Sequence, residues 1–232
     1  MNTLIIDTSS ENLIVCVRTP HGTVDASERT GLVHAANLLD ALDRTLNRAA
    51  VPISALTLVG CGIGPGSFTG IRISVTTCRM ISQLTKVPVV GLRSQRLYTL
   101  HPVFVPGDLV LVAYDAKKKR VFGGLYKTGD DPLSPEVIVE EGDYPMEHLL
   151  DFCTGRPLYA VGNGCRLYAD KVRDTVPECT FLDDHMPDPA MTCAYAEMML
   201  SNGNMPSDYT ALRPFYARLS DAEAAKLGKK TK

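Results

Sequence analysis

The chain has 232 residues, 45% hydrophobic and 22% charged, which is enough to bury a full core as one large domain or two small lobes. Its net charge of -2 gives no general attraction to nucleic acid, which usually requires a basic face. Seven cysteines form no C-x-x-C pair, which argues against zinc knuckles and a disulfide framework. No apolar run approaches the roughly 20 residues of a bilayer span, and no basic leader precedes the first apolar segment. We therefore expect a cytoplasmic protein with no membrane partner.

The first segment predicts two paired strands, at residues 3–6 and 12–18, joined by a polar turn. A third strand with a polar edge is expected at 22–30. Asp7 ends the first strand. Its carboxylate either reaches into a cleft or caps the turn that follows, and both interpretations stay open.

Residues 34–49 carry apolar side chains at the i, i+3, i+4, i+7 spacing of an amphipathic helix. His34 begins this helix and is expected to be a polar N-terminal residue rather than a ligand. The five histidines contain no pair spaced by four residues, so no helical bis-histidine metal site can form.

The segment 64–72, Gly-Pro-Gly-Ser-Phe-Thr-Gly-Ile-Arg, joins a strand expected at 55–59 to a helix that runs through Leu84. Another strand is expected at 87–92, with parallel connections. Pro65 fixes one backbone angle, Gly66 can take the positive φ of a tight turn, and Ser67 is a good N-cap. Gly70 lowers helix propensity by roughly 1 kcal/mol, so another backbone or a ligand should come close to it.

This loop is either an anion site or only a tight turn. Backbone amides and the positive end of the helix converge at Ser67 to Thr69, as they do in anion sites. It is not a Walker loop, because Gly70 is followed by Ile71 rather than lysine. The glycine spacing also differs from that of a dinucleotide fingerprint and of a nucleophile elbow.

The helix after the loop has apolar residues on two sides. Ile71, Val75 and Cys78 cluster on one side, and Ile73, Met80 and Leu84 lie nearly opposite. A helix that is apolar nearly all round is usually buried. One face should pack on its own sheet, and the other on a second subunit or on the second lobe of this chain.

Prolines and a glycine at 101–107 predict a boundary between two lobes, an N-terminal one at 1–103 and a C-terminal one at 104–232. The second half begins like the first, with a strand at 109–114 that ends in Asp115 and a partner strand at 120–126. The turn between them contains three lysines and Arg120. This basic run either binds phosphate or RNA, or forms a solvated hairpin tip.

Further elements are expected as a strand at 137–139, a helix at 146–153, a strand at 158–161 and a helix at 189–199 capped by Asp188. Gly162 follows the last of these strands in a G-x-G pattern that is common at strand ends. The apolar-aromatic segment at 212–218 should dock on the body or on a partner, and the basic C-terminal tail is expected to be disordered.

Four segments of this chain resemble the TsaB (YeaZ) family, the bacterial partner proteins in making threonylcarbamoyladenosine in tRNA. They span the whole chain and are Ile6-Asp7-Thr8-Ser9, Gly64-Pro65-Gly66-Ser67-Phe68-Thr69-Gly70 with Arg72, Ala113-Tyr114-Asp115-Ala116, and Pro214-Phe215-Tyr216-Ala217-Arg218. The resemblance implies an α/β fold of the actin-like (ribonuclease H-like) type, with two lobes of mixed sheets flanked by helices.

The resemblance also implies candidate site residues. Those near a nucleotide or anion would be Asp7, Gly66, Ser67, Thr69, Asp115 and Gly162. Active members of the superfamily place glycines after the acid that corresponds to Asp115, where this chain has lysines. The helices at 34–49 and 68–84 would pack against the equivalent pair of a catalytic subunit, through Leu39, Leu42, Ile73, Val75, Met80 and Leu84.

The implied function is that of a non-catalytic subunit that binds and activates a TsaD-type enzyme, which transfers threonylcarbamoyl to N6 of adenosine 37 in tRNA. TsaD-type subunits carry an H-x-x-x-H metal pair, whereas here Leu38 stands four places after His34. The resemblance implies no catalytic residue, no metal and no tightly bound cofactor, with ATP or ADP at the partner interface left open. A TsaE-type ATPase would join the complex, tRNA would be contacted indirectly, and the isolated chain could form a homodimer.

Two alternatives assign an activity to the chain itself. It could be an ATPase or kinase that uses Asp7 and Asp115, although the phosphate turns are poor in glycine. It could also be an M22-like peptidase, as the glycoprotease label of the superfamily suggests, although the metal pair is missing. A purely homodimeric binding protein is a third interpretation.

Overall fold

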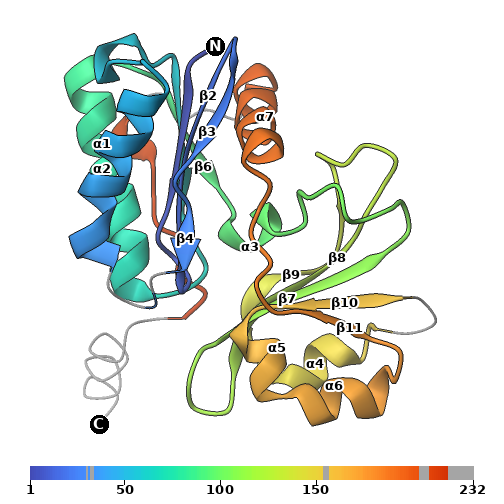
Figure 1. The fold of residues 1–232 in the computed structure, drawn as a ribbon. Coiled ribbons are helices and arrows are strands. Elements are labelled where there is room, and N and C mark those ends of the chain that lie inside the picture. The colour runs from blue at the N-terminus through green and yellow to red at the C-terminus, as the bar shows by residue number, and fades with distance from the viewer. Residues whose placement is uncertain (30, 32–33, 154–156, 204–208, 219–232) are drawn as a thin grey trace, which may run out of the picture.

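The structure, a computed structural model, describes residues 1–29, 31, 34–153, 157–203 and 209–218 (Figure 1). It contains two mixed sheets that follow one another along the chain. The first sheet consists of β1 (Thr3–Asp7), β2 (Asn12–Thr19), β3 (Gly22–Asp25), β4 (Glu28–Arg29), β5 (Leu58–Gly62) and β6 (Val89–Leu92). The second consists of β7 (Leu109–Asp115), β8 (Val121–Lys127), β9 (Glu136–Tyr144), β10 (Leu158–Val161) and β11 (Thr180–Leu182).

The two sheets have the same topology. The first has the order β3-β2-β1-β5-β6, with β4 also paired to β2, and the second has the order β9-β8-β7-β10-β11. In each, the first strand along the chain is antiparallel to the second and parallel to the next strand beside it. The expected α/β fold with two related lobes is confirmed.

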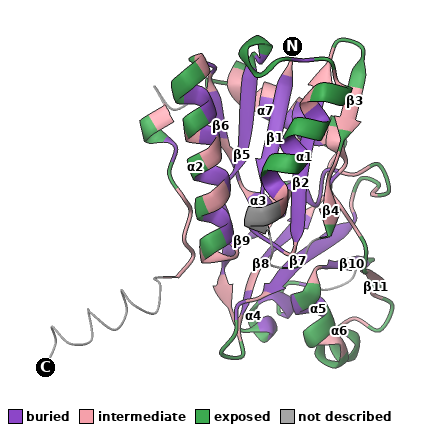
Figure 2. Cartoon of the chain, turned by 60° about the vertical axis from the view of Figure 1, so that its left-hand side comes forward, coloured by how far each residue is buried: buried purple, intermediate pink, exposed green. Residues whose placement is uncertain are grey.

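Helices cover both faces of the first sheet (Figures 1 and 2). On one face lie α1 (His34–Arg48) and α2 (Phe68–Thr85), and on the other lies α7 (Pro189–Ser201). This sheet and its three helices form the first lobe. Strand β1 is buried along its whole length, because Leu4 and Ile6 pack toward α1 and α2 while Ile5 packs toward α7.

The second lobe is the second sheet with its own helices on one face. These are α4 (Met146–Leu150), α5 (Asn163–Leu167) and α6 (Ala169–Thr175). Helix α3 (Ser94–Leu97) follows β6 and contacts β7 and β8, so it lies where the chain passes between the lobes. Short 3-10 helices occupy Ile53–Ala55 and Tyr209–Ala211.

The chain crosses back to the first lobe after β11. The boundary expected after residue 103 separates the strands of the two sheets, but α7 packs on the first sheet, where Cys193 and Ala196 are fully buried. The expected N-cap of α7 is confirmed, since the Asp188 carboxylate accepts a hydrogen bond from the Met191 amide at 2.8 Å. The C-terminal part of the chain therefore contributes to both lobes.

Several expected boundaries were wrong. Strand β5 begins at Leu58, because residues 53–55 form a 3-10 turn after Pro52. Strand β9 is nine residues long, as it pairs with β8 through a bulge. Helices α3, α5 and α6 and strand β11 were not predicted. The basic tail beyond residue 218 lies outside the described residues, among which no helix is long and apolar enough to cross a membrane.

Candidate functional site

The glycine-rich loop packs tightly against the turn that follows β1. A Cβ atom added to Gly70 would lie 1.8 Å from the Thr8 carbonyl oxygen, and one added to Gly66 would lie 2.1 Å from the Ser9 carbonyl oxygen. The Thr8 hydroxyl also donates to the Gly70 carbonyl at 2.7 Å. The close approach expected at Gly70 is confirmed, and the approaching group is the protein's own backbone.

The backbone amides of Ser67 and Gly70, which could bind an anion, already donate hydrogen bonds within the protein. The Ser67 amide donates to the Ser9 carbonyl at 2.6 Å. Ser67 is the N-cap of α2, as expected, because its hydroxyl accepts from the Gly70 amide at 3.2 Å. The positive φ falls at Gly64 (+100°) rather than at Gly66, before a cis peptide bond to Pro65. The loop is therefore a structural joint between β1 and α2.

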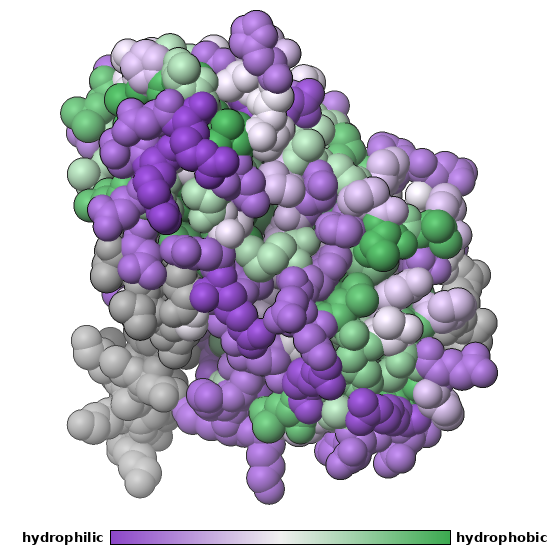
Figure 3. Space-filling model, in the orientation of Figure 1, coloured by the Kyte–Doolittle hydropathy of each residue, from purple (hydrophilic) through white to green (hydrophobic). Residues whose placement is uncertain are grey.

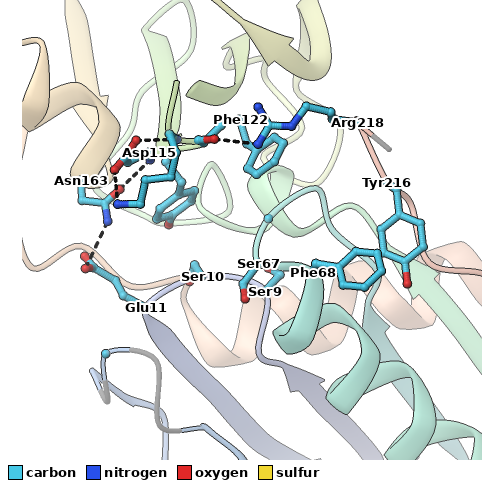
Figure 4. A pocket seen from close by; sticks show the side chains of 16 residues that line it. Ser9, Ser10, Glu11, Ser67, Phe68, Asp115, Phe122, Asn163, Tyr216 and Arg218 are labelled. Atoms are coloured by element: carbon cyan, nitrogen blue, oxygen red, sulfur yellow. Dashed lines mark hydrogen bonds and ion pairs between the residues drawn. The ribbon is translucent and has the colours of Figure 1, made fainter. Parts of the chain in front are cut away.

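A cavity of about 570 Å³ lies between the lobes, and we call it the interlobe cleft (Figure 4). One wall comes from the β1–β2 turn and the start of α2, and the other from the β7–β8 turn and α5. The residues that line it are Ser9, Ser10, Glu11, Gly31, Gly66, Ser67, Phe68, Tyr114, Asp115, Ala116, Lys117, Phe122, Asn163, Tyr216, Ala217 and Arg218.

Asp7 and Asp115 occupy equivalent positions in the two lobes, at the ends of β1 and β7. Each carboxylate accepts a hydrogen bond from the amide two residues later, Ser9 in one case and Lys117 in the other, both at 2.7 Å. Asp7 is 2% exposed and packs against Gly62, where a Cβ atom would lie 2.0 Å from the Asp7 Cγ. Both carboxylates thus cap turns.

Asp115 also bears an ion pair at the cleft wall. The Lys117 ammonium lies 2.6 Å from the Asp115 carboxylate, and the Asp115 amide donates to the Asn163 side chain at 2.9 Å. Partial burial favours a raised pKa for Asp115, but the hydrogen bonds and charge of Lys117 outweigh it and lower the pKa below its ordinary value. The carboxylate is therefore ionised at neutral pH and paired within its own turn.

The β7–β8 turn holds a glycine-like backbone without glycine. Lys117, Lys118 and Lys119 have φ angles of 60°, 54° and 59°, in the left-handed region that non-glycine residues rarely adopt. All three lysines are exposed. The turn therefore carries Cβ atoms and basic side chains at φ angles that glycine adopts most readily.

The floor of the cleft is a buried hydroxyl network. The Tyr98 hydroxyl lies 2.9 Å from the Ser10 hydroxyl and accepts from the Asn12 amide group at 3.0 Å. Burial raises the pKa of Tyr98 to about 12, although these hydrogen bonds lower it. Tyr98 follows α3 and contacts Tyr114 of the second lobe edge to face at 5.6 Å. The network therefore joins the two lobes.

A second polar junction lies behind the cleft, around Glu141 of β9. Its carboxylate accepts hydrogen bonds from the Tyr126 hydroxyl at 2.6 Å and the Arg96 amide at 3.0 Å, and lies 3.6 Å from Arg93. Burial raises the pKa of Glu141 to about 7, although the hydrogen bond from Tyr126 and the charges of Arg93 and Arg96 lower it. This carboxyl titrates near neutrality between the lobes.

The structure brings only some of the candidate anion-site residues together. Gly66, Ser67 and Asp115 line the cleft, whereas Asp7 is buried beneath its floor and Thr69 is exposed outside the lining. Gly162 is adjacent, as the residue before Asn163. Sequence reasoning did not assign Glu11, Phe68, Phe122, Asn163, Tyr216 or Arg218 to the cleft. Of these, Phe68, Asn163, Tyr216 and Arg218 stand in motifs that the sequence analysis names.

The second candidate surface is the outer face of α1 and α2. Leu39, Met80 and Leu84 are 66%, 56% and 79% exposed, and Ile73 is half-buried on the same side of α2. Leu42 and Val75, also expected at an interface, are 8% and 3% exposed and belong to the core beneath the two helices. Figure 3 shows hydrophobic atoms at the edge of the first lobe where α1 and α2 lie.

Two lobes of identical strand order with a cleft between them define an actin-like protein. A model of the family described as "TsaD: tRNA N6-adenosine threonylcarbamoyltransferase" matches residues 27–150. The chain is also 26% identical over 231 residues to the tRNA threonylcarbamoyladenosine biosynthesis protein TsaB of Bacillus subtilis, covering 97% of each protein. The chain belongs to this family of actin-like proteins, in its TsaB (YeaZ) branch. Its role is in the biosynthesis of threonylcarbamoyladenosine in tRNA.

Solved structures show the same fold. The chain is 21% identical to YeaZ from Pseudomonas aeruginosa, with a TM-score of 0.74 over 92% of this chain and 99% of that one. A second Pseudomonas aeruginosa structure, described as similar to peptidase YEAZ, gives a TM-score of 0.77 at 21% identity, over 94% of this chain and 99% of that one. More than nine-tenths of the chain thus matches the YeaZ fold.

Side chains that could bind a metal ion are not clustered in the part of the chain that the structure describes. It contains no group of three or more His, Cys, Asp or Glu side chains that could hold a metal ion. All seven cysteines are free, and six of them are buried.

Proposed function

We propose that the chain is the non-catalytic partner subunit of a tRNA threonylcarbamoyltransferase complex. It binds a TsaD-type catalytic subunit through the outer face of α1 and α2, and activates transfer of threonylcarbamoyl to N6 of adenosine 37. The observation that carries the proposal is the exposed apolar face of α2, combined with membership of the TsaB branch.

The geometry of α2 supports this face as a docking surface. Ile73, Met80 and Leu84 follow at spacings of seven and four residues, so they lie along one side of the helix. Met80 and Leu84 are more than half exposed, and so is Leu39 on the neighbouring helix α1. Burying such side chains between two helix pairs gives about 1.5–3 kcal/mol for each one fully covered. Two helices presented side by side suit packing against an equivalent pair on the partner.

The cleft supports a non-catalytic role. The Asp7 carboxylate caps a turn and the Asp115 carboxylate is ion-paired to Lys117, so both are already engaged by groups of the chain itself. We propose that the isolated chain holds no cofactor tightly, and that ATP or ADP, if used, sits at the interface with the catalytic subunit.

A TsaE-type ATPase joins the assembled complex, and tRNA is held by other subunits. The same apolar face of α1 and α2 allows a homodimer when the chain is alone.

Titration calorimetry with the TsaD-type subunit of the same organism tests the proposal. The double variant Met80→Glu, Leu84→Glu places charges on an exposed face, so the chain should stay folded and lose at least about a hundredfold in affinity. Leu167→Glu is the matched control, because Leu167 is 59% exposed on α5 of the second lobe. Equal binding by the double variant and the control would refute this interface.

A further inference from the structure

The last described segment runs along the first lobe to the cleft. Leu212 is 2% exposed in the core under α2, and its carbonyl accepts a hydrogen bond from Nε of Arg79 at 3.1 Å. Three residues later the Phe215 amide donates to the Ile63 carbonyl at 2.8 Å, beside the glycine-rich loop. This path delivers Tyr216, Ala217 and Arg218 to the mouth of the cleft, which they line.

Tyr216 is attached to the first lobe. Its ring stacks on Phe68 at a centroid distance of 4.8 Å, and its hydroxyl accepts a hydrogen bond from Nε of Arg72 at 3.1 Å. The Arg72 guanidinium also covers Phe68, 3.9 Å from the ring centroid. Phe68 and Tyr216 lie side by side at the start of α2, next to the loop that joins α2 to β5 (Figure 4).

Arg218 is attached to the second lobe. Its Nη2 donates to the Ala116 carbonyl at 2.7 Å, and its Nη1 lies 3.5 Å from the Asp143 carboxylate of β9. The guanidinium is also 5.5 Å from the Phe122 ring centroid. Asp143 is held in place from the other side by Arg120 at 2.9 Å. The contact therefore combines a charge-assisted hydrogen bond with a partly buried ion pair.

Only Ala217 separates the two attachment points. We propose that residues 215–218 form a latch that holds the two lobes together across the interlobe cleft, so that the cleft opens only when Tyr216 or Arg218 is released. Arg93 adds a further tie, because its guanidinium lies 3.3 Å from the Phe215 ring centroid and 3.6 Å from the Glu141 carboxylate of the second lobe.

Another contact between the lobes lies at the opposite side of the cleft from the latch (Figure 4). There, the Asn163 amide group of α5 donates to the Glu11 carboxylate of the β1–β2 turn at 3.4 Å, a long bond between exposed groups. The lobes are thus joined by the Tyr98 network at the floor of the cleft, by this weak contact on one side and by the latch on the other. Release of the latch removes Tyr216 from the Phe68 ring and Arg218 from the Phe122 ring, so both rings become more accessible from the cleft.

Hydrogen exchange on the full chain, measured by mass spectrometry, tests the latch. If the latch couples the lobes, losing its contact with one lobe should also speed exchange in the other lobe. Arg218→Ala removes a side chain that touches only the second lobe, yet it should speed exchange of the Ser67, Gly70 and Ile71 amides in the first lobe by about tenfold. Tyr216→Ala removes the attachment to the first lobe, and should speed exchange of the Ala116, Lys117 and Arg120 amides in the second by a similar factor. Amides of β1 and β7 should keep their protection.

Arg213→Ala is the control, because Arg213 is an exposed arginine of the same segment. It should leave exchange unchanged in both lobes. If each variant speeds exchange only in the lobe that its own side chain touches, the contacts are independent and there is no latch. If Arg218→Ala lowers the protection of β1 and β7, the variant is generally destabilised. The milder variant Arg218→Lys, which keeps the charge but loses the planar guanidinium, then replaces it in the same comparison between the lobes.

Discussion

Gly70 shows how a single missing side chain fixes the joint between β1 and α2. Any Cβ atom there would lie 1.8 Å from the Thr8 carbonyl oxygen, which belongs to a buried backbone turn and cannot move aside. Gly70→Ala should therefore lower the free energy of unfolding by about 3 kcal/mol or more, measured by urea denaturation. Gly129→Ala is the control and should change stability by less than about 0.5 kcal/mol, because the nearest atom to its Cβ would be 3.8 Å away. Similar losses in both variants would contradict this role of Gly70.

Glu141 should give the stability of the protein a pH dependence. Its ordinary pKa is 4.5, but burial raises the pKa in the folded protein to about 7. Between these values the folded state binds the proton that the unfolded chain has released, so stability falls as the pH rises through this window and is independent of this group on either side. Glu141→Gln removes the titration.

The Glu141→Gln variant should therefore gain stability relative to the natural protein as the pH rises from about 4.5 to about 7, by at most about 1.4 kcal/mol per pH unit inside this window. Thermal or urea unfolding at several pH values measures the difference. A difference that stays constant with pH would mean that Glu141 titrates in its ordinary range.

Local chemistry explains which single residues could be predicted from the sequence. The N-caps Ser67 and Asp188 and the close approach at Gly70 follow from rules that act over four residues. The sequence predicted the positive φ angle at Gly66, but the structure has it at Gly64. The proline between them does not indicate which of its two neighbouring glycines has the positive φ. The burial of Glu141 depends on Tyr126, Arg93 and Arg96 of other elements, and no local signal marks it.

Helix α2 separates its two faces sharply. Val75 is 3% exposed among core residues, whereas Met80 is 56% exposed. Val75→Glu should bury a charge and unfold the protein, since the cost of roughly 4 kcal/mol or more is a large part of a typical domain's stability. Met80→Glu should leave the melting temperature nearly unchanged. Circular dichroism on heating distinguishes them, and equal destabilisation by both would mean that the Met80 face is also covered.

The periodicity of α2 predicted both apolar faces, but it could not show which one meets the sheet. Val75 and Leu42 were grouped with the interface because both faces look alike in sequence. The direction of each face is set by β5 and β1, which the helix crosses. Short elements such as α5 and α6 escaped prediction for a related reason, as five to seven residues are too few for a clear helical period.

The repeated strand order makes the whole molecule a pair of related lobes, and the sequence showed this only as a second strand that ends in an aspartate. The return of α7 to the first sheet could not be predicted, because its docking surface is formed by β1, β2, β5 and β6, which all lie far earlier in the chain. The interlobe cleft is likewise assembled from segments that lie far apart along the chain. Its lining comes from the β1–β2 turn, Gly31, the start of α2, the β7–β8 hairpin, α5 and the latch, and no single stretch of sequence contains it.

The cleft should bind nucleotide weakly in the isolated chain. Asp115 is paired with Lys117, and the turn that would surround phosphate carries three lysine side chains on a left-handed backbone. Calorimetry with ATP and magnesium should give no binding tighter than the millimolar range, or about 4 kcal/mol. Micromolar binding that disappears in Asp115→Ala would instead favour an ATPase or kinase.

The most direct test of the partner role is reconstitution of tRNA modification. Purified TsaD-type subunit, threonylcarbamoyl donor and unmodified tRNA are incubated with the chain, without it, or with its Met80→Glu, Leu84→Glu variant, and threonylcarbamoyladenosine is measured by mass spectrometry of the digested tRNA. We predict product only when the natural chain and the TsaD-type subunit are both present, with the Leu167→Glu control as active as the natural chain. Product formed by the chain alone, or equally well by the TsaD-type subunit without it, would contradict the account.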